Sequence, residues 1–245
     1  ALSNVLYSED ILFPIADFYL KKERWNEAIE VYEEMETIGA LQGRGAEYYQ
    51  KLGYALQKNK KYAEAIDAYL KADTLKPDNI WNNRHLAICY RLNRNYQAAL
   101  SYYKKVEEAT PEDTNVIFHI GSCLAELGQY EEAANYFFKL DFIESNCIKA
   151  WRGIGWCSFI SRKYEQAMKY YEKIIEQKPL AIDYMNAGHV AWTMGDIQKA
   201  AALYGKSITA NGNRERFLEM FRKDKEALLK QGIQEEDIPL MLDLL

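Results

Sequence analysis

The chain has 245 residues, which is enough for one or two ordinary domains. Its net charge of −5 disfavours nucleic acid and anionic membrane surfaces as partners. Glycine and proline are sparse, at 13 and 5 residues, which favours an all-helical chain. No apolar run reaches about 18 residues, so we expect no transmembrane helix.

No basic segment followed by an apolar one marks a signal peptide, so we expect a cytoplasmic location. The chain begins at Ala1 without a methionine, and we interpret it as a processed product or as part of a longer protein. Four cysteines do not make a disulfide framework at this length. Cys89, Cys123 and Cys157 share one helical phase, with backbones about 8–10 Å apart, so we expect small buried residues and no bridge.

An internal repeat organises the sequence. One alanine recurs every 34 residues, at Ala65, Ala99, Ala133 and Ala167. Two aromatic columns keep the same period, at Tyr62, Tyr96, Tyr130 and Tyr164 and at Tyr69, Tyr103, Phe137 and Tyr171. Each period looks like two short helices with a break between them, and neither helix can bury its apolar face alone. The period therefore predicts stacked helical pairs.

Six such units follow in chain order, at about residues 9–42, 46–79, 80–113, 114–147, 148–181 and 181–212. After a short lead-in over residues 1–8, the first unit is the least regular. The glycine-rich connection over residues 38–45 is a predicted hinge. In the fourth unit, Gly121, Ala125 and Ala133 stand where helices would touch. Prolines lie where the second helices of three units have ended, at Pro77, Pro111 and Pro179.

The repeat pattern stops at Asn213, so we divide the chain into residues 1–212 and 213–245. Residues 214–230 predict a charged amphipathic helix with Phe217 and Phe221 on its apolar face. We expect this helix to cap the last repeat. The apolar segment over residues 238–245 either packs back on the cap or leads into further chain.

These landmarks resemble the tetratricopeptide repeat, a helix–turn–helix unit of about 34 residues. The second unit matches that family's pattern with Tyr49, Leu52, Gly53, Ala65, Tyr69, Ala72 and Pro77, and the fifth with Trp151, Ile154, Gly155, Ala167, Tyr171 and Pro179. The resemblance covers about residues 9–212. It implies an all-α solenoid, with helix–turn–helix repeats forming a right-handed superhelix and a C-terminal capping helix. First helices would line the concave groove.

The resemblance also implies binding of another protein, through an extended peptide or a helix, in that groove. The family's groove positions give a basic and aromatic set here: Trp81, Arg84, Arg91, Phe118, His119, Lys149, Arg152, Trp156, Phe159, Met185, His189 and Trp192. Such residues are typical binding anchors, so we expect a partner with acidic and apolar side chains, centred on Phe118 and His119. The alternative is that the rings pack between neighbouring helices and the arginines are merely solvated.

Other kinds of site are not expected. A carboxylate clamp would need an arginine where Gly153 follows Lys149. His85 with Cys89, and His119 with Cys123, have a spacing that can hold zinc, but each cysteine belongs to the buried column. We therefore expect no metal and no cofactor. Phosphate-loop and hydrolase motifs are absent, and so we expect no enzyme activity.

The sequence leaves three function hypotheses. The first is a protein–protein interaction scaffold or adaptor. The second is a chaperone for secreted or assembling subunits, and the third is a substrate-recruiting arm of a larger enzyme or sensor. Self-association through exposed aromatic residues or the C-terminal tail is a further alternative. Neither nucleic acid nor a membrane is an expected partner.

Overall fold

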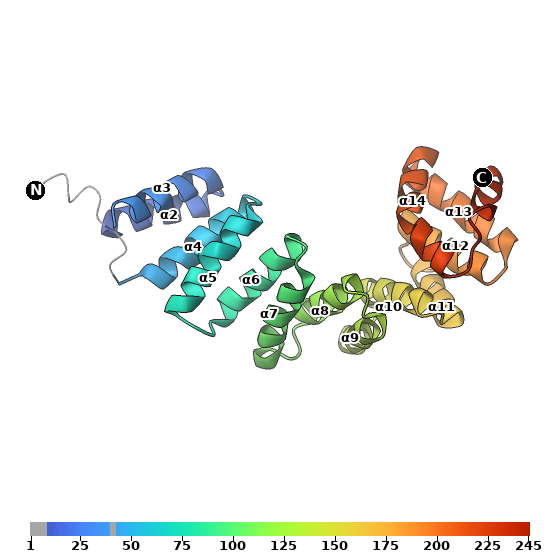
Figure 1. Ribbon diagram of the computed structural model, residues 1–245, viewed down its shortest axis with the longest axis horizontal. Helices are drawn as coiled ribbons and strands as arrows, with labels where there is room; N and C mark the ends of the chain where they lie inside the picture. Colours follow the sequence, from blue (N-terminus) through green and yellow to red (C-terminus); the bar gives the residue numbers. More distant parts are fainter. Residues whose placement is uncertain (1–8, 40–42) are drawn as a thin grey trace, which may run out of the picture. The chain divides into compact units, whose positions relative to one another are not determined.

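The computed structural model describes residues 9–39 and 43–245 (Figure 1). Within these residues every regular element is a helix, so the predicted all-α class is confirmed. None of the described helices is both long enough and apolar enough to cross a bilayer. The predicted lead-in over residues 1–8 and the middle of the predicted hinge, residues 40–42, lie outside the described residues.

The helices follow one another in pairs, as the repeat predicts. The first helices are α2 (Glu9–Lys21), α4 (Gly45–Lys58), α6 (Ile80–Leu92), α8 (Thr114–Glu126), α10 (Ile148–Ile160) and α12 (Ala181–Thr193). The second helices are α3 (Trp25–Thr37), α5 (Tyr62–Leu75), α7 (Tyr96–Ala109), α9 (Tyr130–Ile143), α11 (Tyr164–Ile175) and α13 (Ile197–Asn211). Two further helices follow, α14 (Arg214–Lys230) and α15 (Asp237–Asp243).

The chain forms two compact units that meet within α8, the first ending at Val116 and the second beginning at Ile117. In the first unit, α2 packs on α3, α4 on α5 and α6 on α7. In the second unit, α10 packs on both α9 and α11, and α12 packs on α13. These helices therefore bury their apolar faces against their sequence neighbours, as stacked repeats do.

In four of the units a glycine of the first helix packs closely on a ring of the second helix, and this packing explains the repeat columns. A side chain in place of the column's glycine would lie 2.5–2.9 Å from that ring, closer than carbon atoms approach. The alanine column and the rings are buried for the same reason. The glycine and ring pairs are Gly53 and Tyr69, Gly121 and Phe137, Gly155 and Tyr171, and Gly188 and Tyr204. Cys89, Cys123 and Cys157 are free and buried, as predicted, and so is Cys147, which lies outside their column.

Helix α14 caps the last repeat, as predicted, and Figure 1 shows it beside α12 and α13. Its Phe217, Phe221 and Leu228 are buried. The apolar tail packs back on the second unit through Ile238 and Met241, which are also buried. The segment also contacts the cap, because Arg214 of α14 donates a hydrogen bond to the Leu242 carbonyl.

Candidate functional site

The predicted partner-binding residues divide between the two units. Trp81, Arg84 and Arg91 lie on α6 of the first unit, and the other nine lie on α8, α10 and α12 of the second. The two groups differ in their geometry. The expectation that a partner binds at Phe118 and His119 stays a prediction.

Helices α4 and α6 carry a cluster of rings that is partly open to solvent. Trp81 is 42% exposed, and its ring centroid lies 4.0 Å from that of His85 one turn later. Tyr54 of α4 lies 6.2 Å from Trp81 and 5.6 Å from His85, between centroids. Tyr69 of α5 stacks on His85 from the buried side, at 5.7 Å. The cluster thus has an exposed indole, Trp81, on one side and the buried Tyr69 ring on the other.

A hydrogen-bond network fixes the histidine in this cluster. The Oε1 atom of Gln57 lies 2.8 Å from Nδ1 of His85 and accepts a hydrogen bond from the Tyr69 hydroxyl at 3.0 Å. Because an amide oxygen only accepts, the Nδ1 atom of His85 carries the proton. The ring is therefore held in one tautomer and one orientation beneath Trp81.

Positive charge surrounds the ring cluster. Burial lowers the pKa of His85 to about 4, and the charges of Lys58 and Arg84 act in the same direction. The imidazole is therefore neutral near pH 7 and lies in a positive field. The Lys58 ammonium lies 5.2 Å from the Tyr54 ring centroid, within cation–π range. We call Tyr54, Lys58, Trp81, Arg84, His85 and Arg91 the α4–α6 face.

Two cations of the α4–α6 face have no carboxylate partner. Arg84 forms an ion pair with Asp113 at 2.8 Å, so its charge is offset. Arg91 is held only by the Tyr103 hydroxyl, which lies 3.4 Å from its Nε atom. Within residues 9–39 and 43–245, no carboxylate lies within ion-pair distance of Lys58 or Arg91. These two residues therefore carry the charge available to a partner.

The predicted basic residues of the second unit are paired inside it. Arg152 donates two hydrogen bonds to Asp183, at 2.8 and 2.7 Å, and Asp183 is only 1% exposed. Lys149 pairs with Glu144 at 3.3 Å and lies 5.8 Å from the Phe118 ring centroid. Lys149 and Arg152 therefore each have a counter-charge within the second unit, and their contact with a partner stays a prediction.

Four predicted contact residues are core residues in the structure. Phe159, Met185, His189 and Trp192 are each at most 5% exposed. His189 hydrogen-bonds to the Tyr204 hydroxyl at 2.8 Å, and its Nε2 atom lies 3.4 Å from a carboxylate oxygen of Asp224. We therefore remove Phe159, Met185 and His189 from the candidate contacts, while Trp192 borders a cavity described below.

The cap explains this burial. Phe221 of α14 stacks on Trp192 at 6.4 Å and meets His189 edge-on at 5.4 Å, between ring centroids. The family's groove positions in the sixth unit are thus covered by α14. The apolar face of residues 214–230 indicates this covering in the sequence, because an amphipathic helix buries its apolar face against a neighbour. Phe118, His119 and Trp156 stay half-buried.

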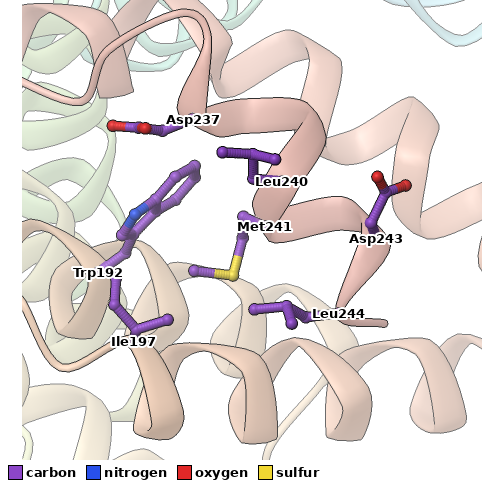
Figure 2. Close-up of a pocket in the computed structure, with 7 residues that line it drawn as sticks. All are labelled: Trp192, Ile197, Asp237, Leu240, Met241, Asp243 and Leu244. Atoms are coloured by element: carbon purple, nitrogen blue, oxygen red, sulfur yellow. The ribbon is translucent and has the colours of Figure 1, made fainter.

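A cavity that sequence reasoning missed lies at the C-terminal end of the second unit. Its volume is about 520 Å³. Figure 2 shows Asp237 beside the Trp192 indole and Asp243 on the other side of Met241. We call this cavity the α15 pocket, and its lining is Trp192, Ile197, Asp237, Leu240, Met241, Asp243 and Leu244.

The described part of the chain holds no cluster of histidine, cysteine and carboxylate side chains that could bind a metal ion. Burial raises the pKa of the Cys89 and Cys157 thiols to about 12, so both are protonated near pH 7. A metal-binding cysteine is a thiolate, and these two behave instead as small apolar residues.

This architecture is a solenoid of helical pairs closed by a capping helix. Three family profiles, each described as tetratricopeptide repeat, match the chain. The first covers residues 91–157, the second covers 46–79, 148–179 and 184–214, and the third covers 12–42. Together they cover most of the sequence, and the chain belongs to the tetratricopeptide repeat family.

Solved structures show the same fold at low sequence identity. A tetratricopeptide repeat protein from Parabacteroides merdae is 19% identical, with a TM-score of 0.66 over 96% of this chain and 97% of its own. YrrB, described as a TPR protein with an unusual peptide-binding site, is 20% identical, with a TM-score of 0.62 over 78% of this chain and 96% of its own. MamA AMB-1 is 23% identical, with a TM-score of 0.60 over 72% of this chain and 92% of its own. A comparison with curated proteins finds no match.

Proposed function

We propose that the chain is a non-enzymatic protein–protein interaction scaffold, and that the α4–α6 face binds an extended peptide or a helix of a partner protein. The tetratricopeptide repeat family supports such a role. YrrB, which has a similar fold, is described as having a peptide-binding site. The observation that carries the proposal is Trp81, an exposed indole in a ring cluster that Lys58 contacts through Tyr54, with Arg91 further along the same helix.

The chemistry of this face favours a partner with acidic and apolar side chains. An apolar side chain would bury the Trp81 indole, and a Trp contact of this kind is typically worth about 2 kcal/mol or more. Carboxylates would pair with Lys58 and Arg91. Exposed ion pairs add only about 0–1 kcal/mol each, so the cations supply selectivity and association rate rather than most of the affinity.

The second unit contributes less to this proposal than the sequence predicts. Phe118, His119 and Trp156 are half-buried and offer ring edges, so they are retained as secondary contacts. Their positive neighbours, Lys149 and Arg152, are neutralised by Glu144 and Asp183. An acidic partner would have to compete with these internal carboxylates, whereas no such competitor stands at Lys58 or Arg91.

The proposal is tested by affinity capture and mass spectrometry. The test variant carries Trp81→Ala, Lys58→Glu and Arg91→Glu. The control variant makes a similar change on the second helices of the same repeats, with Leu75→Ala, Lys76→Glu and Lys105→Glu, all at exposed positions. We expect proteins captured by the wild type to be retained by the control and lost from the test variant.

A further variant with only Lys58→Glu and Arg91→Glu guards against loss of the fold, because it leaves the ring cluster intact. Circular dichroism checks that all variants keep their helices. If neither the triple nor the double variant changes the set of captured proteins, the α4–α6 face is not the binding surface.

A further inference from the structure

The α15 pocket has the size and lining of a binding site. About 520 Å³ lies within the range of pockets that hold small ligands or a few side chains, roughly 300–1,000 Å³. The wall is largely apolar and includes Trp192, Ile197 and Met241. Leu240 and Leu244 border the cavity while 65% and 63% exposed. Together with the apolar hollow they border, these two leucines form a contiguous apolar patch, the kind of surface feature that marks an interaction site.

The helix that carries these leucines is firmly held. Ile238 and Met241 are buried beneath it. The Arg214 guanidinium donates a hydrogen bond of 2.7 Å to the Leu242 carbonyl, and Lys225 pairs with Glu235 at 2.6 Å just before the helix. Leu240 and Leu244 are therefore presented in fixed positions one turn apart, and docking onto them orders little additional chain.

The charges of the pocket are negative. Asp237 and Asp243 both belong to its lining, and both are exposed. In the part of the chain that the structure describes, neither carboxylate forms an ion pair. The cation that reaches α15 is Arg214, and it is engaged with the Leu242 carbonyl. A cationic partner would thus meet two free carboxylates, whereas an anionic one would meet repulsion.

We propose that the α15 pocket docks a segment of a partner protein in which one or two large apolar residues are flanked by lysine or arginine. The apolar residues would cover Leu240 and Leu244 and enter the hollow beside Trp192. The flanking cations would pair with Asp237 and Asp243. This surface is distinct from the α4–α6 face, and the charge that it selects is the opposite one.

The test is a selection from a random peptide display library on the whole chain. One pocket variant carries Leu240→Ser and Leu244→Ser, and a second carries Asp237→Asn and Asp243→Asn; all four positions are exposed, so the fold should persist. The matched control carries Phe142→Ser, at a side chain that is 90% exposed, with Glu165→Gln and Glu219→Gln. Selected peptides are then synthesised, and their affinities for all four proteins are measured by fluorescence polarisation.

We expect selected peptides that pair leucine, isoleucine, phenylalanine or methionine with lysine or arginine. Both pocket variants should weaken their binding by about tenfold or more, as loss of a central interface contact does, and the control should not. Affinity for the wild type and the leucine variant should fall with added salt, and that for the aspartate variant should fall less.

Three results would overturn the proposal. The first is that no selected peptide distinguishes the wild type from the leucine variant. The second is that the pocket-dependent peptides lack basic residues or contain acidic ones. The third is that light scattering shows wild-type oligomers that the leucine variant abolishes, since the pocket would then be filled by a second copy of the chain. None of these results bears on Lys58, Trp81 or Arg91.

Discussion

The α4–α6 face and the α15 pocket belong to the same repeat fold, yet they offer opposite charges. On the α4–α6 face, Lys58 and Arg91 have no carboxylate partner among the described residues, and His85 is neutral because burial, with a smaller effect from Lys58 and Arg84, lowers its pKa. In the second unit, Lys149 and Arg152 are offset by Glu144 and Asp183, and the α15 pocket is lined by the carboxylates Asp237 and Asp243. A basic residue in the groove register is therefore not enough to attract an acidic partner. Its charge is available only where no neighbouring carboxylate offsets it, and Arg84, Lys149 and Arg152 each have such a carboxylate.

The largest expected effect on stability follows from breaking the ion pair between Arg152 and Asp183 in the second unit. Asp183→Ala would leave Arg152 without its partner and the Leu180 amide without its acceptor. Breaking a buried pair costs about 3–5 kcal/mol, but the Arg152 side chain is 33% exposed, so we expect a loss of about 2–4 kcal/mol in the free energy of unfolding. Urea denaturation followed by circular dichroism measures it.

The corresponding change in the first unit is Asp113→Ala, which breaks the ion pair between Arg84 and Asp113. Both partners of this pair are partly exposed, so we expect its loss to cost less. Asp113 also accepts hydrogen bonds from the backbone amides of Asn115 and Val116 at the start of α8. Because Asp113→Ala removes that cap and a solvated ion pair, we expect it to lower the free energy of unfolding by about 1–2 kcal/mol. Equal losses in the free energy of unfolding for Asp113→Ala and Asp183→Ala would contradict the expected difference between the more exposed and the more buried ion pair.

A second comparison asks whether the units share one packing rule. A side chain at Gly53 or Gly188 would meet Tyr69 at 2.8 Å or Tyr204 at 2.5 Å. Overpacking of this kind costs about 1–3 kcal/mol, so Gly53→Ala and Gly188→Ala should both destabilise. Gly205, within α13, has open space around it, so Gly205→Ala should stabilise by about 0.5–1 kcal/mol.

Thermal unfolding of the three alanine variants tests this packing in both units. Destabilisation at Gly53 and Gly188 together with a gain at Gly205 means that each unit packs its own core by the same rule. A stabilising Gly188→Ala would instead mean that Tyr204 moves aside freely. The close packing of first helix on ring would then fail to explain the repeat columns.

Sequence alone predicts the core of this molecule better than its surface. The glycine, alanine and ring columns predict which faces pack, because packing repeats with the period. Ion pairs do not follow from a single column, since Asp113 and Asp183 lie 29 and 31 residues after Arg84 and Arg152. That distance is about one repeat, which puts each carboxylate near the start of the next first helix. A search for acids at that offset would have identified both pairs.

The C-terminal end of the second unit also differs from what the sequence predicts. Family positions placed His189 and Trp192 in an open groove, but α14 covers them with Phe221. The α15 pocket is formed by residues as distant in sequence as Trp192 and Leu244, and no sequence motif predicts it. Such a hollow depends on how the tail folds back, which the repeat pattern does not specify.

A smaller expected effect is the pH dependence that His85 gives to the first unit. Its pKa in the folded chain, about 4, is lower than that of an ordinary histidine, about 6.5. The unfolded chain therefore binds the proton more readily, and the contribution to stability is complete above about pH 6.5. It is lost as the pH falls towards 4, at up to about 1.4 kcal/mol per pH unit.

Two measurements check this pH dependence. Stability of the His85→Gln variant should fall less steeply than that of the wild type between these pH values. In an NMR titration, Lys58→Glu should raise the pKa of His85, because a positive neighbour becomes a negative one. An unchanged pKa would mean that Lys58 does not contribute to the field at the α4–α6 face.

The central claim, that the α4–α6 face takes the acidic and apolar partner, is tested most directly on the indole N–H signals of the five tryptophans. Nitrogen-15 labelling of tryptophan, with assignment by single substitutions to phenylalanine, gives one NMR signal per indole. The partner peptide identified by affinity capture is then titrated in. We predict a shift of the Trp81 signal, with the buried Trp151 and Trp192 signals unchanged. Saturable binding that leaves Trp81 unmoved, or that moves Trp192 instead, would contradict the account.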